Sequence, residues 1–144
     1  MKHFCPDALR NAVEGPILDT PWLDANWQRF LVGISDLEVY AYAPDTGPEE
    51  AGIYFLMNDR AQYLYCGLSN NISRRLDQHK TDGRVPFSRY CWFPVYQELL
   101  SDVERAYIHA LGLPYNRYAD QERWTRHEEM VQAIRERWGL RAES

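Results

Sequence analysis

Cysteine is scarce in this chain of 144 residues. The three that are present, Cys5, Cys66 and Cys91, are widely separated, and none belongs to a Cys-X-X-Cys pair. An odd number of scattered cysteines favours neither a disulfide framework nor a zinc knuckle. We therefore expect all three side chains to be reduced thiols.

Long hydrophobic runs are also missing. The apolar stretches are short and interrupted, well below the roughly 20 residues that a membrane-spanning helix needs. Residues 1–7 lack the apolar core of a signal peptide. With 45% apolar and 26% charged residues, the composition is ordinary for a globule of one core. The expectation is a cytoplasmic protein.

A net positive charge, which nucleic-acid-binding proteins often carry, is absent, since the formal charge is -5. The charges are nevertheless unevenly distributed. Residues 1–50 hold three basic and nine acidic side chains, whereas residues 51–92 hold six basic and three acidic ones. This middle part is either a local anion-binding surface or an ordinary solvated one. Its basic residues are Arg60, Arg74, Arg75, Lys80, Arg84 and Arg89.

The chain contains no internal repeat and no low-complexity tract. Its one linker-like stretch, residues 44–50, is rich in turn formers and acids. In the segment before it, Thr20-Pro21 predicts the start of an amphipathic helix. Residues 38–42 alternate as a strand does, but they are few enough to be an ordered lead-in. The linker-like stretch of residues 44–50 therefore separates an N-terminal extension from the rest of the chain.

Beyond this stretch, local signals predict a hairpin and then a helix. Residues 52–57 and 62–67 are apolar and aromatic, and turn-forming residues join them. Asn70 or Asn71 can cap the helix that follows, which we expect to end near Lys80. The chain thus predicts a strand–strand–helix unit.

A third strand is predicted over residues 87–95. The next helix is expected to be capped at Ser101 and stopped at Gly112, and a last helix is expected from Asp120 to Trp138. This element order predicts an α+β fold, with a small three-stranded antiparallel sheet flanked by helices and extra helices at both ends. The expected organisation is an acidic extension that packs on the core (1–50), the core (51–118) and a C-terminal helix that completes the same domain (119–144).

One ordered set of residues has a more specific meaning. It consists of Gly52-Ile53-Tyr54, Tyr65-Cys66-Gly67, Arg75 with His79, Glu104 and Asn116. In this order and spacing, residues 52–116 resemble the GIY-YIG nuclease family. The resemblance implies that family's small three-stranded fold and the hydrolysis of phosphodiester bonds. Cys66 departs from the usual aliphatic residue of the second motif. Leu68 and Asn70 stand where many members carry basic or hydroxyl residues, which weakens the expected substrate affinity.

The residue types fit this chemistry. Tyr54 and Tyr65, on paired strands, can present two phenols to one side if the register allows, although each also fits an ordinary half-buried strand position. Arg75 and His79 are four residues apart on a helix, so both can face one phosphate. Arginine supplies fixed charge and histidine exchanges a proton near neutral pH. Alternatively, Arg75 pairs with Asp77 or another surface acid.

The resemblance also implies one divalent cation, Mg²⁺ or Mn²⁺, bound by Glu104. Magnesium accepts one or two protein carboxylates while keeping several waters, so a single glutamate is sufficient. A salt bridge of Glu104 with Arg105 or Arg75 is the alternative. The implied catalytic residues are Tyr54, Tyr65, Arg75, His79 and Glu104, and those for substrate binding or structural support are Gly52, Gly67, Ser69, Lys80 and Asn116.

The expected function is that of a metal-dependent endonuclease on nucleic acid, with DNA as the expected polymer. Tyr54 would position or deprotonate the attacking water. A phenol has a reference pKa of about 10, so this role requires positive charge from Arg75, His79 or the metal. The alternative is a catalytically weak or inactive nucleic-acid or protein-binding module on the same fold. The acidic extension could bind a partner protein or mediate self-association, and no membrane partner is expected.

Overall fold

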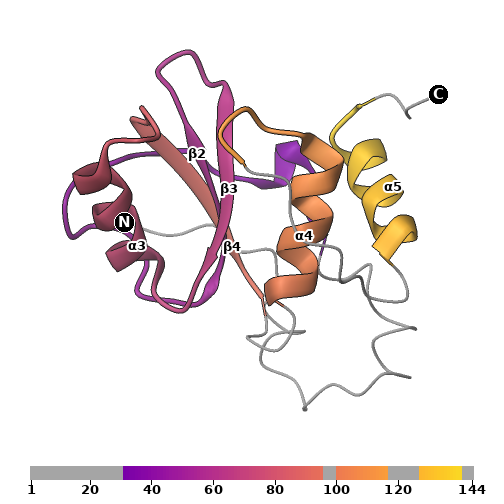
Figure 1. Cartoon of the computed structure of the whole chain (residues 1–144), viewed down its shortest axis with the longest axis horizontal. Coiled ribbons are helices and arrows are strands. Elements are labelled where there is room, and N and C mark those ends of the chain that lie inside the picture. The colour runs from indigo at the N-terminus through magenta and orange to yellow at the C-terminus, as the bar shows by residue number, and fades with distance from the viewer. Residues whose placement is uncertain (1–30, 96–99, 117–126, 141–144) are drawn as a thin grey trace.

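A computed structural model describes residues 31–95, 100–116 and 127–140 of the chain. In these ranges an antiparallel sheet with the strand order β1-β4-β2-β3 lies between helices on its two faces (Figure 1). The predicted α+β class is therefore confirmed. The strands are β1 (Tyr40–Ala41), β2 (Gly52–Met57), β3 (Tyr63–Ser69) and β4 (Arg89–Pro94). The helices are the short 3-10 helix η2 (Ile34–Asp36), α3 (Ile72–Asp82), α4 (Leu100–Leu111) and α5 (His127–Arg137).

The predicted hairpin is formed by β2 and β3. Asn58 shapes the turn between them, because its side-chain oxygen accepts hydrogen bonds from the backbone N–H groups of Arg60 and Gln62, each at 3.0 Å. All six residues of β2 are buried, since this strand pairs with β3 on one side and β4 on the other. The hairpin therefore supplies the central strand of the sheet.

Helix α3 begins and ends at local signals. The Asn71 side chain caps it by accepting the Arg74 backbone N–H at 3.1 Å, and Gly83 ends it in the left-handed conformation with φ of 72°. The carbonyls of Pro48 and Glu50 accept the N–H groups of residues 73 and 72 at 2.8 and 3.1 Å. The linker-like stretch thus packs against the first turn of α3.

Several predicted boundaries differ from those observed. The sheet has one strand more than predicted within the described ranges, because β1 pairs with β4 through Tyr40 opposite Tyr90. Strand β4 is shorter than residues 87–95. Ser101 does not cap α4, since that helix already includes Leu100. The predicted N-terminal helix and the start of the last helix lie outside the described residues.

The two faces of the sheet bury different side chains. Helices α4 and α5 cover one face, where Phe55, Phe93 and Tyr107 belong to an apolar core that also includes Leu31 and Val32. Helix α3 covers the opposite face (Figure 1). This face has a second core, which consists of Tyr40, Tyr54, Leu56, Leu64, Ile72, Leu76, Val85, Phe87, Tyr90 and Trp92. No described helix is long and apolar enough to cross a bilayer.

Candidate active site

The predicted tyrosine pair lies on the α3 face of the sheet. Tyr54 is opposite Gly67 and Tyr65 is opposite Leu56, so the two tyrosines are diagonal neighbours on one face. Their ring centroids are 6.2 Å apart. The Tyr54 hydroxyl lies 2.7 Å from Nε2 of His79, which α3 brings over the sheet. The hairpin register and one helix therefore bring two phenols and an imidazole together.

Gly67 is required by the position of the Tyr54 ring. A Cβ atom at this residue would collide with the hydroxyl and Cζ of Tyr54 and would also crowd the Tyr65 ring. The Tyr54 phenol therefore crosses β3 over a residue without a side chain. In the same way, Gly52 allows β2 to approach the Phe93 carbonyl of β4. The glycines of the two motifs act through close packing.

Burial sets the protonation states of this pair. Tyr54 is fully buried, and desolvation raises its pKa well above the usual range, although the Arg75 guanidinium opposes this shift. Desolvation, together with the charges of Arg75 and Arg84, lowers the pKa of His79 to about 4. The phenol and the imidazole are thus both neutral near pH 7, and His79 adds no positive charge beside Tyr54.

Arg75 lies at the solvent side of the phenols. Its side chain is exposed, and its Nη1 donates to Oε1 of Gln78 at 3.1 Å. Hydrogen bonding with Tyr54 is the main cause that raises the Arg75 pKa, with a smaller contribution from Tyr65. The alternative partner Asp77 instead accepts the Tyr42 hydroxyl at 2.7 Å. Arg75 is therefore the cation next to both phenols.

Glu104 reaches this group from α4. It accepts a hydrogen bond from the Leu68 backbone on β3, the edge strand of the described sheet, and its charge acts on Tyr65 and Arg75. Desolvation raises the pKa of Glu104 and its neighbours offset this only in part, which leaves the pKa at about 7. Arg105, the alternative partner, forms an ion pair with Asp102 at 3.9 Å.

The environment of Glu104 fits a hard cation. A carboxylate whose burial is incompletely offset by neighbouring charges is stabilised in its ionised form by a bound cation. Within the described ranges, no three His, Cys, Asp or Glu side chains gather as a metal-binding group. Glu104 would therefore hold a magnesium-like ion together with water and substrate oxygens, as such ions accept.

The residues predicted as support lie around this group. Asn116 braces β3, because its side chain accepts the Cys66 N–H at 2.9 Å and donates to the Cys66 carbonyl at 2.8 Å. Ser69 shapes the entry to α3 through its hydroxyl and the backbone of Asn71. Lys80 donates to the Phe87 carbonyl at 2.9 Å. These contacts are structural ones.

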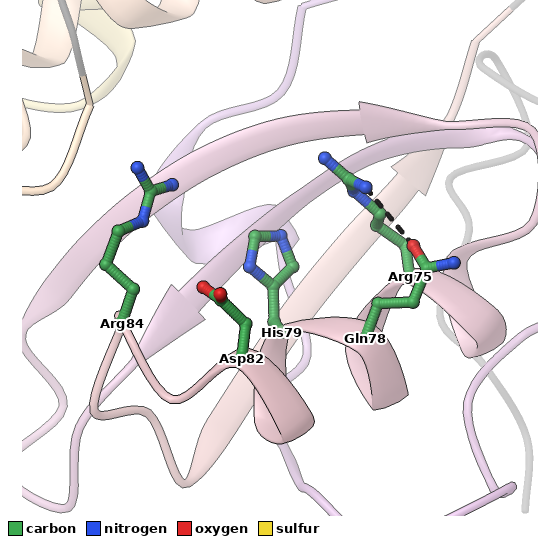
Figure 2. Close-up of a pocket in the computed structure, with 5 residues that line it drawn as sticks. All are labelled: Arg75, Gln78, His79, Asp82 and Arg84. Carbon is green, nitrogen blue, oxygen red and sulfur yellow. Dashed lines mark hydrogen bonds between the residues drawn. The ribbon is translucent and has the colours of Figure 1, made fainter.

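A pocket of about 450 Å³ opens next to Arg75 and His79 (Figure 2). Its remaining lining residues are Gln78, Asp82 and Arg84, none of which was predicted as a site residue. The sequence marked Arg84 only as one of six basic residues in the middle of the chain. The one signal in the sequence was its position directly after Gly83, which ends α3 one helical turn beyond His79. That position could have indicated that Arg84 lies near His79.

Comparison with known proteins identifies the family of this domain. None of the curated proteins compared with the chain matches it. The family profile described as GIY-YIG catalytic domain matches residues 50–118, a range that includes the tyrosines, α3, Glu104 and Asn116. The motif order, the fold and the profile lead to one conclusion: the chain carries a GIY-YIG catalytic domain, the domain of a nuclease family, over residues 50–118.

Proposed function

We propose that this protein is a metal-dependent endonuclease that hydrolyses phosphodiester bonds in nucleic acid, with DNA as the expected polymer. One observation carries the proposal. A buried Tyr54–His79 hydrogen bond of 2.7 Å lies beneath the exposed Arg75, and α4 brings Glu104, with its pKa raised to about 7, to the same group. Phenol, imidazole, guanidinium and carboxylate together match the needs of phosphoryl transfer.

Substrate binding would begin at Arg75. Its exposed guanidinium offers a planar set of donors to phosphate oxygens, and it also covers the fully buried Tyr54 phenol. A phosphate that draws this guanidinium outward would uncover the phenol oxygen. Binding would thereby admit the attacking water only when a substrate phosphate is present.

Hydrolysis then requires a path for one proton. Water attacks phosphorus, the bond from phosphorus to the leaving oxygen breaks, and that oxygen takes a proton from solvent. The proton lost by the attacking water passes to the Tyr54 oxygen while the Tyr54 proton passes to Nε2 of neutral His79, 2.7 Å away. The bound phosphate anion would raise the His79 pKa and so favour this transfer. Arg75 offsets the charge on the phosphoryl oxygens.

Glu104, with water and substrate oxygens, would hold the cation. When bound, such an ion offsets the charge of the phosphate and of the leaving oxygen. The carboxylate must be ionised for this, and its pKa of about 7 makes that state available near neutral pH.

The test compares Glu104→Gln and Arg75→Gln with the wild type on plasmid, linear and single-stranded DNA and on RNA, with Mg²⁺ or Mn²⁺. Each variant is expected to lower the cleavage rate by about 10²–10³-fold, the usual effect of removing one electrostatic contact to a transition state. Asp102→Asn and Arg74→Gln are the matched controls, because they remove the same charges from the same helices at positions outside the group.

Wild-type cleavage that Glu104→Gln leaves unchanged would refute the role of that carboxylate, and the same holds for Arg75→Gln. Binding without cleavage on every substrate and with either metal would instead favour the inactive binding module. The substrate panel separates DNA from RNA in the same experiment.

A further inference from the structure

Arg84 is the feature of the pocket that the proposed chemistry does not use. It lies at one end of the pocket and Arg75 at the other, with His79 and Asp82 between them (Figure 2). Its side chain is exposed. Among the described residues, no carboxylate lies at ion-pair distance from Arg84, in contrast to Arg105, which pairs with Asp102. This guanidinium is therefore available to an external anion.

The charge of Arg84 reaches the reacting groups. It lowers the pKa of His79 and opposes the raised pKa of Tyr65, so its guanidinium lies within electrostatic range of both side chains. A positive charge at that place disfavours a protonated His79. An anion bound between Arg75 and Arg84 would cancel this effect. Without a bound anion, the charge of Arg84 therefore opposes proton transfer to His79. This favours an anion-binding role for Arg84 over a direct catalytic one.

The pocket is large enough for a segment of a polyanion. Its volume of about 450 Å³ is in the range of sites that hold small organic ligands. A nucleic-acid strand carries a negative charge at every nucleotide, so a strand held at Arg75 presents a neighbouring phosphate to the next cation along its path. Arg84 is the other arginine that lines the pocket.

We propose that Arg84 binds a second phosphate of the substrate strand, adjacent to the phosphate held at Arg75. This inference rests on the proposed nuclease function and deepens it. The pocket would thus be a binding site for the flanking nucleotide of the strand being cut, with Arg75 at the reacting phosphate and Arg84 at its neighbour.

The experiment measures binding of labelled single- and double-stranded DNA in EDTA, at several salt concentrations, by fluorescence anisotropy. The variants are Arg84→Gln, Arg84→Lys and the control Arg74→Gln, which removes an exposed arginine of α3 that does not line the pocket. Loss of one phosphate contact should make the negative slope of log K against log salt shallower by about 0.7–0.9 and weaken binding roughly fivefold near 0.1 M salt. Arg84→Lys should keep most of the slope, and Arg74→Gln should change it less than Arg84→Gln does.

Equal slopes for Arg84→Gln and Arg74→Gln, in a protein whose wild type binds the DNA and cuts it with Mg²⁺, would overturn the inference and leave the nuclease function standing. A wild type that neither binds nor cuts any nucleic acid would overturn both. Circular dichroism and thermal unfolding check that each variant is folded, which we expect because both arginines are exposed.

Discussion

Two tyrosines, one on each side of the sheet, are fully buried and yet have different surroundings. Tyr54 faces α3, and Tyr107 of α4 lies in the core of the opposite face. Desolvation raises both pKa values well above the usual range. The Tyr107 hydroxyl accepts the Val32 N–H at 2.8 Å and donates to the Val32 carbonyl at 3.2 Å. Its partners are thus backbone groups that cannot change their protonation state.

The Tyr54 hydroxyl instead has His79 and Arg75 as neighbours. One of these side chains can gain a proton, and the other is exposed and free to turn toward an anion. Burial and a perturbed pKa are therefore common to a structural and a functional tyrosine, and the chemical nature of the partners distinguishes them. Four experiments can break or sharpen this comparison.

The largest difference is expected between Tyr54→Phe and Tyr107→Phe. Each change removes a buried hydroxyl and should cost about 1–3 kcal/mol of unfolding free energy, because partners lose a hydrogen bond. Only Tyr54→Phe should lower kcat, by about 10²–10⁴-fold, the range for loss of a proton-transfer group. Steady-state cleavage and urea unfolding measure the two effects. Equal losses of kcat would remove the distinction between the two faces.

A smaller loss of activity is expected from Gly67→Ala. The added methyl group would displace the Tyr54 phenol, and a displacement of about 1 Å can cost roughly 100-fold in rate. Gly139→Ala is the matched control. Gly139 has a φ of 70° with open space around it, so this variant should lose about 1 kcal/mol of stability and no activity. Cleavage by Gly67→Ala at the wild-type rate would contradict the packing of Tyr54 over β3.

The pH dependence of cleavage tests Glu104. Its carboxyl has a pKa of about 7 in the folded protein, so protons compete with the cation below that pH. At low Mg²⁺ concentration, the rate should fall about tenfold per pH unit below this pKa. A higher Mg²⁺ concentration should partly restore the rate at pH 6. A rate that is flat from pH 6 to 8 at low Mg²⁺ would refute the assignment of Glu104 as the metal ligand.

The smallest effect concerns stability without metal. The pKa of His79 is lowered from 6.5 to about 4, so its contribution to stability is lost as the pH falls through that window. The pKa of Glu104 is raised from 4.5 to about 7, so its contribution is lost as the pH rises through that window. Between pH 4.5 and 6.5 the two slopes oppose each other, each at about 1 kcal/mol per pH unit.

Relative to the wild type, Glu104→Gln should therefore gain stability as the pH rises through this window, and His79→Gln should gain it as the pH falls. Urea unfolding in EDTA at several pH values measures these slopes. If the unfolding free energies of the wild type and the two variants change in parallel with pH, neither pKa is shifted as the burial of its group indicates.

Local signals predicted much of the fold. The turn at Asn58, the cap at Asn71 and the stop at Gly83 depend on neighbours in the sequence, so the hairpin and α3 could be located. The alternation of residues 38–42 is a local strand signal, but the pairing of β1 with β4 as a fourth strand joins residues far apart in the sequence. Ser101 has a residue type that favours helix caps, but α4 already includes Leu100.

The site also has features that local sequence predicts and features that depend on distant contacts. Motif order identified the two tyrosines, and the spacing of Arg75 and His79 placed them on one helix face. The direction of Arg84 depends on how the chain leaves α3. The full burial of Tyr54 depends on Gly67 and on packing under α3. The burial of His79 under the same helix lowers its pKa, which is why Arg75, rather than His79, supplies the positive charge.

The central claim is that Glu104 on α4 and Tyr54 under α3 belong to one phosphodiester-cleaving site. A double-mutant cycle on kcat/KM with Tyr54→Phe, Glu104→Gln and the combined variant tests it most directly. The account predicts that the combined variant is about as slow as the slower single variant, because groups that act as a unit are strongly non-additive. Single-variant losses that multiply in the combined variant would show two independent contributions and would contradict the claim.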